Sequence, residues 1–269
     1  MPHYLCVTCG TQFAETTEPP TECPICIDDR QYIGWQGQHW TTLEQLRTDH
    51  RTIFKTEEPR LTGIGMEPAF AINQRTQVVQ TPSGNVLWES TSLIDDATIA
   101  QVNALGGLTA IAISHPHFYS AMVEWSRAFE VPIYLHVADR QWVLRPDPAI
   151  VFWEGDRHSL NLDLTLIRCG GHFSGSTALH WRGGAEGRGV LLAGDTIYVA
   201  ADRRWVSFMH SFPNLLPLPA SAVNQIVAAV EPFAFDRIYS AWFDRVLMTD
   251  AKAALRRSAD RYIRAITDS

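Results

Sequence analysis

Residues 109–117 read TAIAISHPH, and this stretch decides the fold. Its first six residues are small, apolar or β-branched without interruption, which predicts an interior strand of a sheet. The strand ends at His115, and Pro116 stiffens the turn that leads to His117. Because side chains two residues apart on an extended chain share a face, both imidazoles point the same way. The stretch therefore predicts a strand that presents a pair of histidines.

Two later stretches have the same form. The run DLTLIR (163–168) leads to Gly170-Gly171-His172, and the run GVLLAG (189–194) leads to Asp195. Imidazoles and a carboxylate at strand ends suit zinc or iron, and the two glycines would let the backbone approach the metal closely. An Asp followed by Thr can instead cap a turn through its own backbone. We predict a metal site whose ligands are His115, His117, His172 and Asp195.

These stretches resemble the motifs of the metallo-β-lactamase superfamily, over roughly residues 64 to 269. The family pattern is His-x-His-x-Asp-His, then Gly-His with small residues, then Gly-Asp-Thr, then a final His. The matching segments here are SHPHFYS (114–120), GGHFSGS (170–176), LLAGDT (191–196) and IYSAWF (238–243). The resemblance implies an α+β fold, the αββα four-layer sandwich, with metal ligands at one rim between two mixed sheets.

Two of the four motifs lack ligands that the family has. Tyr119 and Ser120 stand where the family has Asp and His, and residues 240–242, Ser-Ala-Trp, stand where the last His is expected. In the family these groups hold a second metal, so the resemblance implies an atypical site with one metal on the three remaining histidines. Tyr119 either fills the second-metal space, with its hydroxyl as a catalytic hydrogen-bond donor, or packs as the first turn of a helix.

The N-terminus carries a second candidate metal site. Two Cys-x-x-Cys turns, separated by 13 residues, supply Cys6, Cys9, Cys23 and Cys26. Four thiolates at this spacing suit Zn²⁺ or a single iron, and the pattern resembles a zinc ribbon or a rubredoxin-like module. A segment of about 35 residues buries too little apolar surface to fold alone, so the metal supplies folding energy. Structural zinc, redox iron and a reducible dithiol pair remain alternatives.

We therefore divide the chain into a four-cysteine metal module (1–35), a connector (36–63) and a metallo-β-lactamase-like domain (64–269). Residues 42–50 predict a short helix in the connector. Within the large domain, turn residues 81–84 predict a hairpin, and helices are expected from Asp95 or Asp96, after His117, from Pro219 to Val230, and from Thr249 or Asp250 onward.

Composition narrows the functional classes. The 269 residues carry a formal net charge of −7, and residues 1–50 hold two basic against seven acidic side chains. Nucleic-acid surfaces have the opposite sign, so we expect no nucleic-acid partner. No apolar run reaches about 18 residues and no signal-peptide pattern opens the chain, which favours a cytoplasmic protein with no membrane contact. The oligomeric state cannot be read from these residues.

The ligand set suggests a hydrolase. A single Zn²⁺ on the histidines would activate a water, with Asp195 as general base or as fourth ligand, against a small carbonyl substrate such as an ester, lactone, thioester or amide. Zn²⁺ is thus expected at both sites, with iron possible at either. A mononuclear non-haem iron dioxygenase is the rival enzyme, since two histidines and a carboxylate suit Fe(II). A non-catalytic metal-binding scaffold is the third possibility.

Overall fold

In the computed structural model, which describes residues 1–267, the apolar run before His115 forms β7 (Ala110–Ala112), an interior strand of a seven-stranded sheet. Strand β7 pairs in parallel with its neighbours β6 and β8, whereas the strands from β3 to β6 pair antiparallel. The other strands of this sheet are β3 (Arg51–Glu58), β4 (Leu61–Glu67), β5 (Thr76–Val79), β6 (Val86–Trp88), β8 (Ile133–His136) and β9 (Ile150–Trp153).

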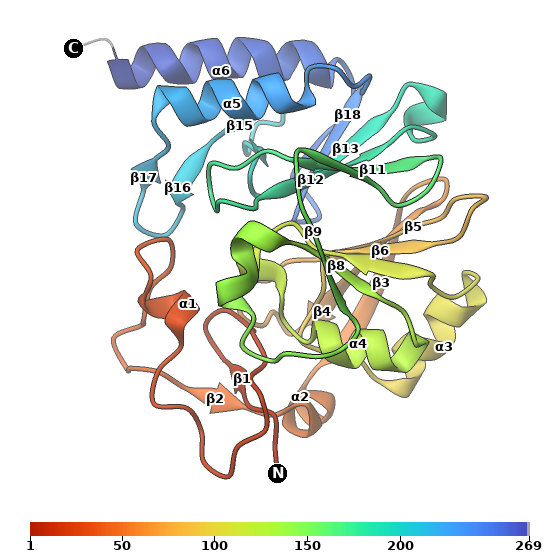
Figure 1. Ribbon diagram of the computed structural model, residues 1–269, viewed down its shortest axis with the longest axis vertical. Helices are drawn as coiled ribbons and strands as arrows, with labels where there is room; N and C mark the ends of the chain where they lie inside the picture. The colour runs from red at the N-terminus through yellow and green to blue at the C-terminus, as the bar shows by residue number, and fades with distance from the viewer. Residues whose placement is uncertain (268–269) are drawn as a thin grey trace. The chain divides into compact units, whose positions relative to one another are not determined.

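The chain falls into two units. The first comprises residues 1–135 and 139–152, and the second comprises residues 136–138 and those from Trp153 onward. Most of the seven-stranded sheet lies in the first unit, together with the cysteine-rich N-terminal segment (Figure 1). That segment has two short paired strands, β1 (Leu5–Cys6) and β2 (Trp40–Thr41), and one helical turn, α1 (Pro24–Ile27).

The helices of the first unit begin where capping residues predict. The Thr42 side chain accepts a hydrogen bond from the Gln45 backbone and opens α2 (Leu43–Asp49), and Asp95 caps α3 (Asp96–Ala104) in the same way at 2.7 Å. Such caps satisfy amide groups that the helix itself cannot. After a short 3-10 turn at residues 116–118, α4 (Met122–Phe129) ends at Glu130, which has left-handed backbone angles.

The second unit contains a six-stranded sheet in the order β10-β11-β12-β13-β18-β19. Only β13 and β18 pair in parallel. Its strands are β10 (Arg157–Ser159), β11 (Leu164–Arg168), β12 (Thr177–Trp181), β13 (Val190–Gly194), β18 (Arg237–Ser240) and β19 (Val246–Leu247). Two small hairpins follow Asp195, formed by β14 (Tyr198–Val199) with β15 (Val206–Ser207) and by β16 (Met209–Ser211) with β17 (Leu216–Pro217).

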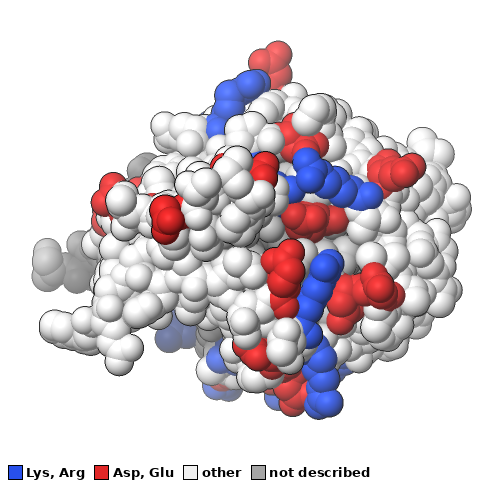
Figure 2. Space-filling view, turned by 90° about the horizontal axis from the view of Figure 1, so that it is seen from below, with Lys and Arg blue, Asp and Glu red and all other residues white. Residues whose placement is uncertain are grey.

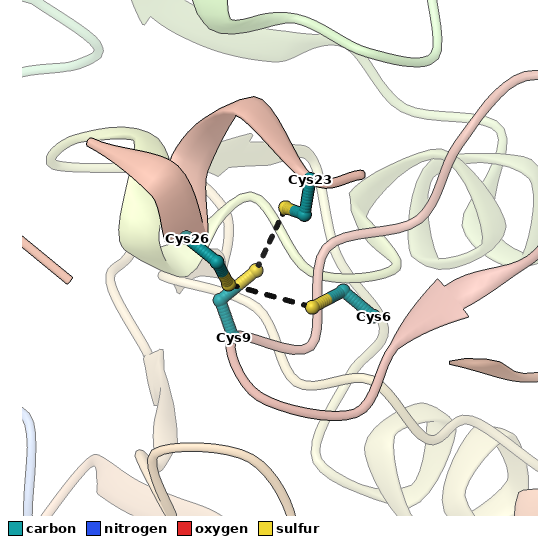
Figure 3. Close-up of side chains that lie close together, drawn as sticks. All are labelled: Cys6, Cys9, Cys23 and Cys26. Atoms are coloured by element: carbon teal, nitrogen blue, oxygen red, sulfur yellow. Dashed lines mark hydrogen bonds between the residues drawn. The ribbon is translucent and has the colours of Figure 1, made fainter. Parts of the chain in front are cut away.

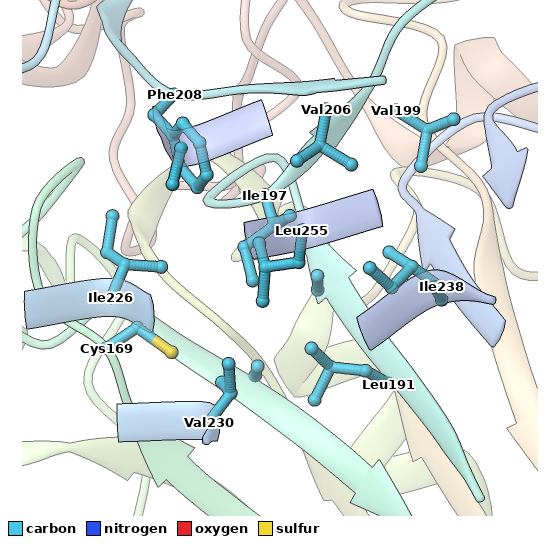
Figure 4. Packing of buried hydrophobic residues seen from close by; sticks show 14 of the residues in the cluster. Cys169, Leu191, Ile197, Val199, Val206, Phe208, Ile226, Val230, Ile238 and Leu255 are labelled. Atoms are coloured by element: carbon cyan, nitrogen blue, oxygen red, sulfur yellow. The ribbon is translucent and has the colours of Figure 1, made fainter. Parts of the chain in front are cut away.

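Two helices, α5 (Ala220–Val230) and α6 (Ala251–Thr267), lie side by side over this sheet (Figure 1). Their apolar faces meet the sheet in one cluster, in which Leu191, Ile226, Ile238 and Leu255 are almost fully buried (Figure 4). Burying one such side chain stabilises the fold by about 1.5–3 kcal/mol. The cluster therefore anchors the strands that carry the second half of the candidate site.

Charged side chains on the surface are mixed in sign. Figure 2 shows acidic and basic groups next to one another on one face. Surface ion pairs such as Arg188–Asp236 (2.9 Å) and Arg127–Asp147 (3.1 Å) follow this pattern, and solvent screening makes such pairs weak. Among residues 1–267, no helix combines the length and apolar character needed to cross a bilayer.

The mixed α+β class predicted from the sequence is confirmed. The predicted hairpin is β5–β6, and the predicted helices correspond to α2 to α6. One region differs from the sequence interpretation: residues 51–67, assigned there to the connector and the domain edge without strands, form β3 and β4. Strand β3 is an edge strand whose side chains are nearly all exposed or half-buried, and β4 contains Gly63 and Gly65. Both features weaken the apolar pattern by which a strand is recognised in a sequence.

Candidate metal centres

His115 and His117 are held by the end of β7 and the 3-10 turn that follows. Both side chains are almost fully buried, at 1% and 2% exposure, and their ring centroids lie 5.1 Å apart. The Ser114 hydroxyl shares a hydrogen bond of 2.8 Å with His115 Nδ1, and the Ser114 backbone N–H donates to Glu89 Oε2 at 3.0 Å. Outer partners of this kind orient a histidine so that Nε2 faces the metal.

His172 and Asp195 lie after β11 and β13 of the second unit. His172 Nδ1 donates to the Met209 carbonyl at 3.0 Å, which leaves Nε2 as the nitrogen that can bind a metal. That Nε2 is 3.8 Å from Asp195 Oδ2, and both side chains are buried, at 0% and 4% exposure. A zinc ion with nitrogen and oxygen ligands at about 2.0–2.1 Å holds neighbouring ligand atoms about 3.4 Å apart, so this pair is close to ligating geometry.

Gly170 and Gly171 form the turn before His172 and pack against α5. Their φ angles are +66° and +80°, which glycine adopts readily. A Cβ at Gly170 would lie 2.9 Å from Gln225 Nε2, and one at Gly171 would lie 2.8 Å from Ile226 Cδ1, both on α5. Both positions favour glycine because their φ angles are positive and because the turn packs against α5.

The four predicted ligands lie together. One ligand atom from each of His115, His117, His172 and Asp195 falls within 4.8 Å of the others, and all four residues are buried. Three imidazoles and one carboxylate are ligand types that both zinc and non-haem iron bind, so this arrangement fits either ion. We call this set the histidine–aspartate group.

Tyr119 is buried at 2% exposure and immediately precedes the turn into α4. Burial, together with the negative charges of Asp139 and Glu89, raises the pKa of its phenol well above the usual value. The side chain is therefore a neutral hydroxyl at any ordinary pH, able to donate a hydrogen bond but not to act as a phenolate.

Two buried carboxylates near Tyr119 were missed by sequence reasoning. Glu89 and Asp139 are 1% and 2% exposed, and Glu89 has a φ of +68°. A non-glycine residue with such a φ is uncommon and often marks a functional position. Glu89 directly follows the apolar strand β6, a strand-end signal that could have been read, whereas nothing in the local sequence distinguishes Asp139.

The four N-terminal cysteines also lie together, and we call this set the cysteine cage (Figure 3). Cys6 Sγ is 3.5 Å from Cys26 Sγ, and Cys9 Sγ is 3.7 Å from Cys23 Sγ. A disulfide has an S–S length of about 2.05 Å, so all four are free thiols. A tetrahedral zinc with Zn–S bonds of about 2.3 Å places neighbouring sulfurs about 3.8 Å apart, which these distances approach. A single iron suits the same cage.

Electrostatics in this cage favours a bound cation. Hydrogen bonds from Cys23, Cys26 and Cys9 lower the pKa of Cys6 far below that of a free thiol. The shared hydrogen bonds with Cys23 and then Cys6, with burial, raise the pKa of Cys26. The cluster by itself thus supports one thiolate more easily than several, and a cation would allow the others to ionise. The Gln38 side chain also donates to Cys6 Sγ at 3.0 Å.

Two further histidines form hydrogen bonds with backbone groups. His136 Nε2 contacts the Gly155 carbonyl at 3.1 Å while its Nδ1 accepts from the Ala138 N–H. His180 Nε2 contacts the Ala234 carbonyl at 2.8 Å. Burial lowers the pKa of both rings, so each is held neutral.

The fold is shared with solved metallo-β-lactamases. DIM-1 metallo-β-lactamase exposed to ceftazidime superposes with a TM-score of 0.58 at 10% identity, covering 81% of this chain and 98% of that one. VMB-1 gives 0.59 at 11% identity, over 81% and 99%. FIM-1 from Pseudomonas aeruginosa in its mono-zinc form gives 0.57 at 14% identity, over 78% and 95%. The predicted metallo-β-lactamase fold is confirmed.

A search of protein-family models finds no match to this chain. The uncharacterized protein YmaE of Bacillus subtilis (strain 168), in contrast, is 52% identical over 268 residues, which span 99% of this chain and 97% of YmaE. With the predicted ligands gathered on a metallo-β-lactamase fold, the chain belongs to the same family as YmaE.

Proposed function

We propose that the chain is a metal-dependent hydrolase with one metal ion in the histidine–aspartate group. The observation that carries the proposal is that the four residues of this group lie together and are buried. By resemblance, Tyr119 and Ser120 stand where the family has ligands of a second metal. The mono-zinc form of FIM-1 shows that this fold accommodates a single zinc in another protein. We propose zinc in this chain as well, both here and in the cysteine cage.

When bound, a zinc ion supplies a Lewis acid and lowers the pKa of a water ligand toward about 7. The residues of the chain prepare that chemistry. Met209 fixes the His172 tautomer, and Ser114 orients His115. The Asp195 carboxylate, 3.8 Å from His172, would orient the attacking water or accept its proton.

The substrate that suits this arrangement is a small carbonyl compound. A single Lewis acid can polarise the carbonyl of an ester, lactone, thioester or amide, whereas phosphodiester cleavage benefits from a clamp of two metals. The neutral hydroxyl of Tyr119 would serve as a hydrogen-bond donor to the developing oxyanion. We therefore propose Tyr119 as a second catalytic residue, in addition to Asp195.

The test is hydrolysis of an activated aryl ester and of a lactone by zinc-loaded protein. The rate should rise with pH through an apparent pKa near about 7. Asp195→Asn should remove most of the activity, and His117→Ala should remove metal and activity together. Asp202→Asn, at a surface carboxylate paired with Arg204, is the matched control and should behave like the parent protein.

An iron dioxygenase is the second candidate. The observation in its favour is the cysteine cage, whose sulfur spacing suits iron as well as zinc and would place a redox centre in the same chain. It predicts iron in the histidine–aspartate group of protein made in iron-replete cells, and oxygen uptake with a thiol or persulfide substrate. Such uptake, combined with no ester or lactone cleavage by the zinc form, would replace the hydrolase proposal. A protein that binds metal but shows neither activity would support the scaffold alternative.

A further inference from the structure

The cysteine-rich segment contacts the turn that follows the metal-binding histidines. The backbone N–H of Gln12 donates to the Ser120 carbonyl at 3.1 Å, although the two residues are far apart in sequence. Ser120 lies three residues after His117 and has a φ of +34°. A serine in this region of backbone space is strained and persists only where its surroundings hold it.

Further hydrogen bonds hold the same turn. The Gln74 side chain donates to Ser120 Oγ at 2.8 Å and to the Ser90 carbonyl at 3.2 Å. The Ser90 hydroxyl in turn donates to the carbonyls of Phe118 and Tyr119, both at 3.0 Å. Each residue from 118 to 120 therefore forms at least one hydrogen bond with a group outside this stretch.

The contact continues without a break into the cysteine cage. Gly10 directly follows Cys9, and its N–H donates to the Cys6 carbonyl at 2.8 Å, while the Cys6 N–H donates to Thr11 at 3.0 Å. The Ser92 hydroxyl donates to the Gly10 carbonyl at 2.9 Å. Residues 10–12 thus share their backbone hydrogen bonds with the cysteine turn on one side and with Ser120 on the other.

Gly10 also has no room for a side chain. Its φ is +80°, and a Cβ there would lie 2.5 Å from Ser92 Oγ, 3.2 Å from Ala71 Cβ and 3.6 Å from Ser120 Oγ. The close fit means that residues 10–12 can lie on Ser120 only while the cysteine turn keeps them in this conformation. Four thiols alone hold that turn weakly, since the metal supplies the folding energy of such cages.

We propose that residues 10–12 act as a clamp through which metal binding at the cysteine cage positions His117 and strengthens metal binding by the histidine–aspartate group. The inference rests on the core metal site of the proposed function. By resemblance, a second metal would hold this turn in the metallo-β-lactamase superfamily. In this chain the clamp and Gln74 hold it instead. His117 directly precedes the stretch 118–120, so release of this stretch would also release the backbone of His117. Ser120, Gln12 and Gly10 are positioning residues and touch no substrate.

The experiment compares Gly10→Ala with Gly37→Ala in the full-length protein. Gly37 has nearly the same φ, +85°, but nothing lies within 4 Å of its would-be Cβ, so it reports backbone strain alone. Cobalt absorption of the thiolate cage reports whether the cage is loaded. Zinc affinity of the histidine–aspartate group is measured by chelator competition, and amide hydrogen exchange follows residues 116–122.

With the cage loaded, Gly10→Ala should weaken zinc binding by the histidine–aspartate group about tenfold, as loss of an outer partner does, and should speed exchange at residues 116–122. Gly37→Ala should do neither. Gln74→Ala should reproduce the Gly10→Ala result without touching the cysteine segment, and Cys23→Ser should produce it together with loss of the cage spectrum.

Unchanged zinc affinity and unchanged exchange in Gly10→Ala and Cys23→Ser would overturn the proposal. If Gly10→Ala does not fold, Gln74→Ala decides the question. Its zinc affinity and its amide exchange at residues 116–122 are measured with the cage metal present and with the cage metal removed. This test is independent of the hydrolase proposal. Zinc affinity of the histidine–aspartate group can be measured, and can depend on the cysteine cage or not, even in a protein that cleaves no ester. Exchange at residues 116–122 also tests the clamp if the group binds no zinc at all.

Discussion

Replacing Gly171 by alanine tests how the turn before His172 is built. The φ of +80° costs an L-residue about 1–2 kcal/mol. The new Cβ would also lie 2.8 Å from Ile226 Cδ1 and 3.1 Å from Leu218 Cδ1, two side chains that are themselves buried in the cluster under α5 and cannot move freely. Overpacking of this kind costs about 1–3 kcal/mol, so the total destabilisation should be about 2–5 kcal/mol.

Gly187→Ala separates the two contributions. Gly187 has a φ of +86° with nothing within 4 Å of its would-be Cβ, so its replacement reports strain without overpacking. Urea denaturation of both variants at one fixed zinc concentration should show Gly171→Ala less stable than Gly187→Ala by about 1–3 kcal/mol. Metal analysis should show lower zinc occupancy only for Gly171→Ala, because His172 is the next residue. Equal stability of the two variants would refute the packing argument.

Two further predictions concern Tyr119 and His180. Tyr119→Phe should leave zinc content unchanged and lower kcat about 100-fold if the hydroxyl donates to the oxyanion, and an unchanged kcat would return Tyr119 to a packing role. Burial lowers the folded-state pKa of His180, so the unfolded chain binds the proton more readily; stability is therefore present above the unfolded value of about 6.5 and is lost as pH falls below it. Urea midpoints between pH 7.5 and 5 should fall less steeply for His180→Gln than for the parent protein, and parallel curves would contradict this.

Much of the candidate site could be predicted because its residues follow strongly patterned strands. His115 and Asp195 come directly after apolar runs that form β7 and β13, and strand ends are where a scaffold presents ligands. The cysteine cage was predictable from spacing alone, since Cys-x-x-Cys turns limit where the thiols can go. Both patterns lie within short stretches of sequence, so they can be recognised without the folded structure.

What could not be predicted depends on residues distant in sequence. Glu89 and Asp139 approach Tyr119 only in the folded chain, and no short pattern relates them. The contact between Gln12 and Ser120 is of the same kind, because its donor is a backbone N–H, which every residue except proline has. The packing of Gly171 against α5 could not be predicted either, because Ile226 lies more than 40 residues later in the chain.

Metal stoichiometry tests the central claim most directly. Native mass spectrometry of full-length protein without a polyhistidine tag, reconstituted with zinc in slight excess, should show two metal ions per chain, one on four cysteines and one on the histidine–aspartate group. His172→Ala should then show one ion, with the cobalt spectrum of the cysteine cage intact. Three or more tightly bound ions, or two ions retained in His172→Ala, would contradict a single mononuclear site in the core.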